Sequence, residues 1–358
     1  ILSVRFVNIV PLLKVTVCDI VIVVIVAWVS EWIFRKLFPP RKMLVVYEEY
    51  DPTDFIRKLN TRKDKYKVEQ KINVSVGLKV LEEEIKKYEG VVIYDVHSEM
   101  RNKILKFCYG NDIRAYSTTK VSDILIRGAE SLHIFDTPLL LYRNHGLSFE
   151  QRFVKRTMDI VVSALMLLIT SPIFLIASIA IKLYDGGPVF YRQARCTMNG
   201  KVFHIFKFRS MIVDAEKDGK SQPAADHDPR ITPVGRVLRA TRLDELPQLI
   251  DILIGNMSLV GPRPERVEHV EKYTEDLAEF EYRLKVRGGL TGYAQIYGKY
   301  NTSPYDKLQL DLIYIQNYSI FLDIKLILMT IKIMFMKEST EGFSEEQKKE
   351  YVDRKSVV

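Results

Sequence analysis

The chain has 358 residues, more than a single hydrophobic core usually organises, so two domains are expected. Its 53 Lys and Arg against 45 Asp and Glu give a net charge of +8 at pH 7, which favours an acidic partner such as nucleic acid, anionic lipid or a phosphorylated substrate. Cys18, Cys108 and Cys196 lie far apart without CxxC spacing, which argues against a disulfide framework or a zinc site and fits a reducing cytosolic setting.

The first apolar run extends from Val15 to Phe38, about the 20 residues that cross a bilayer. Trp28 and Trp32 lie near its end and basic residues follow, an order that predicts a transmembrane helix with its far end in the cytoplasm. Asp19 and the β-branched residues leave a buried helix or strand as the alternative. Because the first residue is Ile1 and no small-residue cleavage site follows the run, we expect residues 1–42 to be a membrane segment, not a signal peptide, in a chain truncated upstream.

Residues 43–148 change character, with short strand-like runs that alternate with helix-like stretches. The strand-like runs are Met43–Tyr47, Val68–Val76, Gly90–Tyr94 and Ile113–Tyr116, and the helix-like stretches include Leu78–Tyr88 and Ser98–Tyr109. This alternation predicts a parallel α/β sandwich. The first strand is followed by YEEYD instead of a glycine-rich loop, so no phosphate site is predicted there. We interpret this domain as regulatory or scaffolding.

A second apolar run extends from Ile160 to Leu183, with Ser171 and Pro172 near its middle. Proline removes a helical hydrogen bond and clashes with the preceding turn, so a sharp bend is expected. Both flanks are basic, which places both ends on the cytoplasmic side. These features predict a re-entrant helix–break–helix hairpin over residues 156–183, in which Ser171 partners a freed carbonyl. A kinked full span is the alternative.

A third apolar stretch, Phe321–Met336, is short for a span. Its Lys325 and Lys332 lie near one helical face, the pattern of a helix in the membrane interface. An ordinary amphipathic core helix is the alternative. Residues 341–358 are charged and low in apolar residues, so a poorly ordered tail is expected.

The segment Asp228–Glu265 carries the residues best suited to chemistry. Asp244 and Glu245 stand just before Leu246 and Pro247, a pattern that by itself is typical of the first turn of a helix. Several cations flank the pair in sequence. They are Lys207, Arg209, Arg230, Arg236, Arg239, Arg242, Arg263 and Arg266. Guanidinium groups suit phosphate oxygens, one carboxylate can attack phosphorus and its neighbour can bind Mg²⁺, although arginines near acids are often only surface ion pairs. The GxxxxGK[ST], HExxH and GxSxG motifs are missing from the sequence, which disfavours P-loop, zinc-hydrolase and serine-hydrolase chemistry.

Residues from about Lys155 to Phe335 resemble the bacterial sugar transferase family, the monotopic polyprenyl-phosphate phosphoglycosyl transferases. The matching motifs are KRTMDIVVSALMLLITSPIF, KFRSM, DPRITPVGRVLR, LDELPQL, MSLVGPRPE, LTGYAQ and the stretch from Tyr314 to Thr330. Several motifs in order over half of the chain make the resemblance specific.

The resemblance implies that Asp244 attacks the β-phosphorus of a UDP-sugar, releases UMP and carries the phosphosugar, which undecaprenyl phosphate then accepts. It assigns Mg²⁺ to Glu245 and substrate-facing positions to Arg239 and Arg263. Weaker candidates for substrate contact are Lys207, Arg209, Arg230 and Gln295.

The resemblance also implies the architecture of the long members of the family. These combine an N-terminal transmembrane helix, a Rossmann-like α/β domain (43–148) and a mostly helical catalytic domain (149–340) with a re-entrant hairpin. The expected location is the bacterial inner membrane with the catalytic domain facing the cytoplasm. The expected partners are the lipid bilayer and the two substrates and not a nucleic acid, and a homodimer is a possible assembly. A membrane-anchored scaffold with an inactive transferase domain is the alternative function.

Two positions depart from the family pattern. Thr197 stands where a glycine is common, and Gly288–Tyr293 reads GGLTGY where PGITGW is frequent. These changes bear on which sugar is bound more than on the acidic pair.

Overall fold

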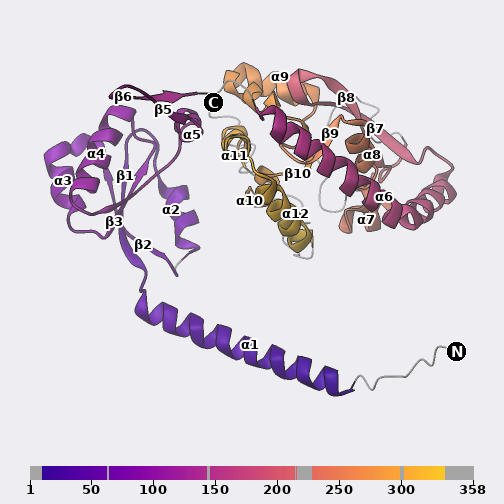
Figure 1. Ribbon diagram of the computed structural model, residues 1–358, viewed down its shortest axis with the longest axis horizontal. Helices are drawn as coiled ribbons and strands as arrows, with labels where there is room; N and C mark the ends of the chain where they lie inside the picture. Colours follow the sequence, from indigo (N-terminus) through magenta and orange to yellow (C-terminus); the bar gives the residue numbers. More distant parts are fainter. Residues whose placement is uncertain are drawn as a thin grey trace. The chain divides into compact units, whose positions relative to one another are not determined.

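The computed structural model describes residues 10–62, 64–142, 146–213, 215, 228–298 and 302–334 (Figure 1). Chain contacts divide it after Thr118 into two units, which are described separately. The sequence predicted the boundary between the two domains after residue 148. The structure places it earlier because α5 (Val121–Arg127) packs against α11 (Pro304–Gln316), so that Ile124 joins the core of the second unit. The predicted charged tail, 341–358, lies outside the described residues.

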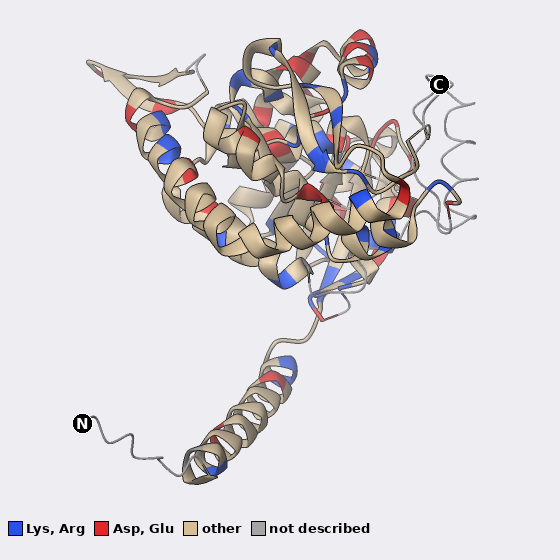
Figure 2. Cartoon of the chain, turned by 90° about the vertical axis from the view of Figure 1, so that its right-hand side faces the viewer, with Lys and Arg blue, Asp and Glu red and all other residues tan. Residues whose placement is uncertain are grey.

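Helix α1 (Val10–Leu37) corresponds to the first predicted span. Its segment Leu13–Leu37 is long and apolar enough to cross a membrane, and none of that segment is buried within the chain. Figure 2 shows α1 largely free of charge along its middle, with Arg35 and Lys36 in its last turn, where cations interact favourably with the helix dipole. Among the described residues, α6 is the other helix that meets the same criteria.

A four-stranded parallel sheet in the order β2-β1-β3-β4 forms the centre of the first unit and confirms the predicted α/β layer (Figure 1). Its elements are β1 (Arg41–Tyr47), α2 (Thr53–Asn60), β2 (Tyr66–Asn73), η1 (Val74–Val76), α3 (Leu78–Ile85), β3 (Gly90–Tyr94), α4 (Ser98–Gly110) and β4 (Arg114–Ser117). Alternate side chains of a strand point to opposite faces, so a strand covered on both sides reads as a continuous apolar run. Met43 and Val45 accordingly pack toward α2, while Leu44 and Val46 pack toward α3 and α4.

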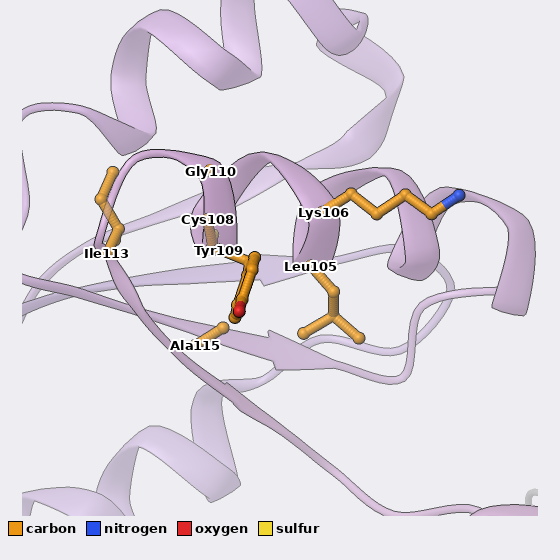
Figure 3. Close-up of a pocket in the computed structure, with 7 residues that line it drawn as sticks. All are labelled: Leu105, Lys106, Cys108, Tyr109, Gly110, Ile113 and Ala115. Carbon is orange, nitrogen blue, oxygen red and sulfur yellow. The ribbon is translucent and has the colours of Figure 1, made fainter.

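A shallow cavity of about 550 Å³ lies between α4 and β4 (Figure 3). Leu105, Tyr109 and Ala115 are among the residues that line it. None of the residues predicted to carry chemistry borders this cavity, so its size alone does not locate a functional site.

The second unit contains the rest of the chain and is mostly helical. Its elements after α5 are β5 (Glu130–Ile134), β6 (Thr137–Leu141), α6 (Phe149–Asp185), β7 (Phe190–Cys196), η2 (Met198–Gly200), β8 (Val202–Phe208), α7 (Pro233–Ala240), η3 (Leu243–Glu245), α8 (Gln248–Ile254), β9 (Met257–Val260), α9 (Val267–Asp276), η4 (Ala278–Lys285), β10 (Gly288–Thr291), α10 (Tyr293–Tyr297), α11 and α12 (Ile320–Met334). Antiparallel β7 and β8 form a hairpin, and β9 pairs with β10 in parallel.

Helix α6 contains the second apolar run and begins at a capping box. The Ser148 hydroxyl accepts a hydrogen bond from the Gln151 N–H, and the Gln151 side chain accepts one from the Ser148 N–H. The helix ends at Gly186, whose left-handed backbone (φ +70°) suits glycine.

The predicted break at Pro172 is wrong in one respect, because α6 continues through it as a single helix. Pro172 has no N–H to offer to the Leu168 carbonyl, and the Ser171 hydroxyl donates to that carbonyl instead, at 2.8 Å. This confirms the expectation that Ser171 partners a freed carbonyl and explains how the helix tolerates proline. A re-entrant course through the membrane stays a prediction.

A buried polar network ties α6 to the centre of the second unit. The ammonium of Lys155 on α6 lies 2.6 Å from the carboxylate of Asp323 on α12. The Tyr314 hydroxyl lies 2.8 Å from the same carboxylate and 3.2 Å from the carbonyl oxygen of Val260, the last residue of β9. Both charged groups are almost fully shielded from solvent, so each depends on the other for compensation.

A second buried carboxylate on α6 holds the same strand. Asp159 accepts a hydrogen bond from the Ser258 hydroxyl at 3.0 Å and from the Leu259 N–H at 2.9 Å. Two positions of α6, four residues apart and therefore on one face, thus fix the course of β9.

Replacing Lys155 with Met is expected to destabilise the protein strongly, by about 3–5 kcal/mol, because it leaves the carboxylate of Asp323 buried without a cation. Replacing both residues, Lys155→Met with Asp323→Leu, should recover most of that loss. The measurement is the free energy of unfolding of the detergent-solubilised protein. Equal destabilisation in the single and double variants would contradict the pairing.

Candidate functional site

Asp244 and Glu245 form the last two residues of η3, a single 3₁₀ turn between α7 and α8. Arg242, just before this turn, has a left-handed backbone (φ +55°), which a residue with a Cβ adopts only under strain. The N-cap of α8 is Pro247, and no side chain caps that helix. The acidic pair therefore does not serve as the ordinary helix cap that its sequence pattern suggested.

Glu245 is held by two cations from distant parts of the chain. The Lys207 ammonium, from β8, and an Arg263 guanidinium nitrogen, from the loop after β9, each lie 2.9 Å from Oε1 of Glu245. Burial would raise the pKa of Glu245, but the charges of Arg263 and Lys207 outweigh it and hold the pKa well below its usual value. Glu245 is therefore ionised at neutral pH.

Asp244 has the opposite electrostatic environment. Burial, and then the charge of Glu245, raise its pKa, while Lys207 and Arg239 lower it less. No cation lies within ion-pair distance of its carboxylate among the described residues. Two adjacent carboxylates with pKa values shifted in opposite directions are typical of a catalytic pair.

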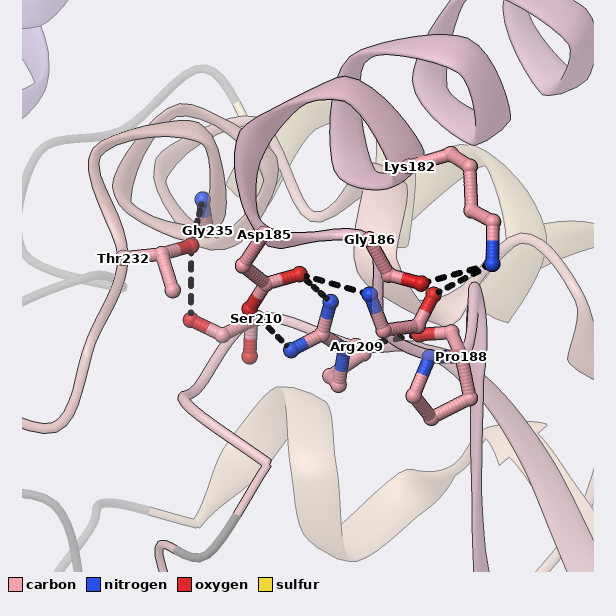
Figure 4. A network of polar contacts seen from close by, with 9 residues as sticks. Lys182, Asp185, Gly186, Pro188, Arg209, Ser210, Thr232 and Gly235 are labelled. Carbon is pink, nitrogen blue, oxygen red and sulfur yellow. Dashed lines mark hydrogen bonds and ion pairs between the residues drawn. The ribbon is translucent and has the colours of Figure 1, made fainter.

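The turn that carries the pair is held through α7. The Thr232 hydroxyl caps α7 by accepting from the Gly235 N–H at 2.9 Å (Figure 4). The Thr232 N–H donates to the Ser210 carbonyl at 3.1 Å. A Cβ on Gly235 would lie 1.9 Å from that carbonyl oxygen, so only glycine allows α7 to approach the chain after β8 so closely.

The loop that carries Arg263 rests on contacts between two backbones. Gly261 donates to the Thr291 carbonyl and Gly289 donates to the Pro262 carbonyl, both at 2.8 Å. A Cβ on Gly289 would lie 2.1 Å from the nitrogen of Gly261. The backbone of β10 therefore positions this loop, and the two backbones lie too close together for a side chain to fit between them.

The two departures from the family pattern meet beside this loop. The buried Thr197 hydroxyl accepts from the Gly288 N–H at 3.2 Å and donates to the Asn256 carbonyl at 2.8 Å. Thr197 thus contributes a hydroxyl bridge that a glycine would lack.

Some candidates lie away from the acidic pair. The Arg209 guanidinium pairs with Asp185 at the end of α6 and donates from Nε to the Pro188 carbonyl at 2.7 Å (Figure 4). Arg230 pairs with Asp228. Gln295, on α10, donates to the Leu290 carbonyl at 3.3 Å. These contacts give Arg209, Arg230 and Gln295 structural partners, and only Lys207, Arg239 and Arg263 act electrostatically on the pair.

Two residues beside the pair were not predicted from the sequence as site residues. Arg195 from β7 and Gln248 from the first turn of α8 border a cavity together with Lys207 and Arg263. Gln248 stands within LDELPQL, four residues after Asp244, and that spacing was the available signal.

The acidic pair keeps carboxylate oxygens that a divalent cation could bind. Both cation contacts of Glu245 use Oε1, which leaves Oε2 and the Asp244 carboxylate as oxygen ligands. The described residues contain no cluster of three or more metal-binding side chains. The donor set of one or two free carboxylates is of the kind with which Mg²⁺ binds in proteins, together with substrate phosphates.

Comparison with known proteins places this site in a family. The family model described as bacterial sugar transferase matches residues 150–337. The UDP-glucose:undecaprenyl-phosphate glucose-1-phosphate transferase of Klebsiella pneumoniae is 38% identical over 254 residues, which cover 70% of this chain and 53% of the relative. The enzyme of the same name from Escherichia coli K12 is 42% identical over 211 residues, covering 58% and 44%.

A third relative matches over a larger share of both chains. The UDP-N-acetylgalactosamine-undecaprenyl-phosphate N-acetylgalactosaminephosphotransferase of Aeromonas hydrophila is 31% identical over 324 residues, which cover 87% of this chain and 71% of the relative. By comparison, the chain spans about half the length of the Klebsiella and Escherichia relatives.

Asp244→Asn and Glu245→Gln are expected to change stability in opposite directions at pH 7. The raised pKa of Asp244 means that its ionised form destabilises the fold, so the amide should raise the melting temperature, an effect that fades as the pH falls through the raised pKa toward 3.8. The lowered pKa of Glu245 means that its ionised form stabilises the fold above pH 4.5, so Glu245→Gln should lower the melting temperature. Thermal unfolding across pH measures both, and equal shifts would contradict the assignment.

Proposed function

Because the chain belongs to the bacterial sugar transferase family, we propose that it transfers a sugar 1-phosphate from a UDP-sugar to undecaprenyl phosphate. The products are undecaprenyl diphosphate sugar and UMP. This is the first membrane step in building an exopolysaccharide, capsule or O-antigen unit. The three relatives described above are named as transferases to undecaprenyl phosphate, which supports the proposed acceptor.

The observation that carries the proposal is the contrast between the two carboxylates. Glu245 is ion-paired and Asp244 is not, although they are neighbours in one turn. A carboxylate that is partly desolvated and lacks a countercharge is a better nucleophile than one held by two cations. Asp244 is therefore the group proposed to react.

In the proposed reaction, an Asp244 oxygen bonds to the β-phosphorus of the donor, and the bond from that phosphorus to the bridging oxygen breaks. The bridging oxygen leaves with the electron pair as part of UMP. An oxygen of undecaprenyl phosphate then attacks the same phosphorus and displaces the Asp244 carboxylate, which is thereby regenerated. The covalent phosphosugar–aspartate divides one difficult transfer into two displacements.

The cations around the pair would offset the charge of the substrates. Lys207 and Arg263 are fixed by Glu245, and Arg239 lies close enough to lower the pKa of Asp244. Preorganised positive groups stabilise charge that develops on phosphoryl oxygens. When bound, Mg²⁺ would neutralise further phosphate charge, with Glu245 as its protein ligand.

The proposed location is the inner membrane, with this site facing the cytoplasm. Two apolar helices support a membrane location. The basic flanks of α6 favour the cytoplasmic side for both of its ends. A re-entrant α6 would hold the acidic pair near the headgroups, where the phosphate of a polyprenyl lipid lies. We also propose that residues 43–148 have a regulatory or scaffolding role. The assembly that we propose is a homodimer.

The purified protein with Mg²⁺, undecaprenyl phosphate and a UDP-sugar is expected to release UMP. Asp244→Asn should abolish the release because the amide cannot form the covalent intermediate. A panel of UDP-sugars, including UDP-glucose and UDP-N-acetylgalactosamine, identifies the donor by its rate. Undiminished release by Asp244→Asn would exclude it as nucleophile, and no release by the wild type with any donor would favour an inactive scaffold.

Glu245→Gln is expected to raise the Mg²⁺ concentration needed for half-maximal UMP release, because an amide oxygen binds Mg²⁺ more weakly than a carboxylate. Glu281→Gln, in η4, is a matched control on an exposed acid outside the site. An unchanged Mg²⁺ titration in Glu245→Gln would remove its assigned role.

A further inference from the structure

A small, partly open cavity lies beside the acidic pair, on the side of Lys207 and Arg263. Its volume is about 10 Å³, enough for one oxygen-sized atom. Arg195, Lys207, Gln248 and Arg263 supply its polar lining. We call it the Arg195–Gln248 pocket.

Two residues that line the pocket carry hydrogen-bond donors that the protein leaves unused. Nε2 of Gln248 and Nε of Arg195 are buried without a hydrogen-bond partner among the described residues. Gln248 is only 3% exposed, so water outside the fold does not reach it freely. The other guanidinium nitrogens of Arg195 are engaged, with the Pro264 carbonyl at 3.0 Å and the Gln193 side chain at 2.6 Å. Buried donors without a partner destabilise a fold and are rare unless something fills their place.

Positive charge is in excess around this pocket. Three cations line it, and Glu245 is the carboxylate that pairs with two of them. Burial and the charge of Arg263 lower the pKa of Arg195 to about 10, although the charge of Glu265 opposes the shift. The charge of Arg195 is therefore desolvated and lies near a second arginine, and a bound anion would stabilise it.

We propose that the Arg195–Gln248 pocket binds one anionic phosphate oxygen of the nucleotide, and that Arg195 and Gln248 are binding residues for it. The proposal rests on the transfer reaction proposed above, whose donor and leaving group both carry such an oxygen. The volume admits a single oxygen and not a whole phosphate, so the phosphorus would lie outside the pocket, toward Lys207 and Arg263. A lone water has the same size, but it would need acceptors for its own hydrogens in a lining made mainly of donors.

Gln248→Met tests the proposal, since methionine has nearly the same size and no donor. We expect this variant, as full-length protein in detergent, to bind UMP roughly ten- to a hundred-fold more weakly than the wild type, the loss typical of a hydrogen bond to a charged group. Its melting temperature should be equal or higher, because the change removes an unpaired buried amide. Gln70→Met, on the exposed edge strand β2, is the matched control and should bind UMP normally.

Arg195→Lys is the second variant, because it keeps a positive charge and loses the Nε donor. It should also weaken UMP binding. Wild-type affinity for UMP in both variants would show that the pocket holds only a structural water, and a lower melting temperature in Gln248→Met with unchanged UMP affinity would assign Gln248 to packing.

UMP binding needs no turnover, so the two proposals fail separately. A wild type that binds UMP through Gln248 but releases none from any UDP-sugar supports the pocket and refutes the reaction. A wild type that turns over, with KM and UMP affinity unaffected by Gln248→Met, refutes the pocket and leaves the reaction intact.

Discussion

A single carboxylate oxygen organises the candidate site. Oε1 of Glu245 is shared by Lys207 and Arg263, which come from β8 and from the loop after β9. Like charges in a poorly solvated region repel one another, so the two cations remain close only while the carboxylate lies between them. Because both cations pair with Glu245, its neighbour Asp244 has no ion-pair partner among the described residues. The different environments of the two acids follow from this one three-way contact.

The sequence predicted the two central strands of the first unit well because β1 and β3 are apolar on both faces. The runs at Met43–Tyr47 and Gly90–Tyr94 lie within or coincide with β1 and β3. The acidic pair could also be found from its motif, along with the cations Lys207 and Arg263. The structure brings Lys207 and Arg263 into contact with Glu245, and the catalytic roles of these residues stay predictions.

What could not be predicted depends on partners distant in sequence. The guanidinium of Arg209 was a candidate for phosphate, but Asp185, more than twenty residues earlier, already pairs with it. Proline at 172 suggested a break in the helix, yet the hydroxyl of Ser171 replaces the missing donor and the helix continues. The domain boundary moved because Ile124 of α5 packs into the second core, a contact that local composition does not reveal.

The glycines beside the loop that carries Arg263 affect how the results of a mutational scan of this protein should be interpreted. Gly261 and Gly289 touch no reacting group, and their contribution is the absence of a side chain where two backbones meet. Even alanine at Gly289 would have to displace the loop, and Arg263 with it. Functional screening would then rank these glycines with the acidic pair, and a tolerance map alone would overstate the number of residues that take part in the chemistry.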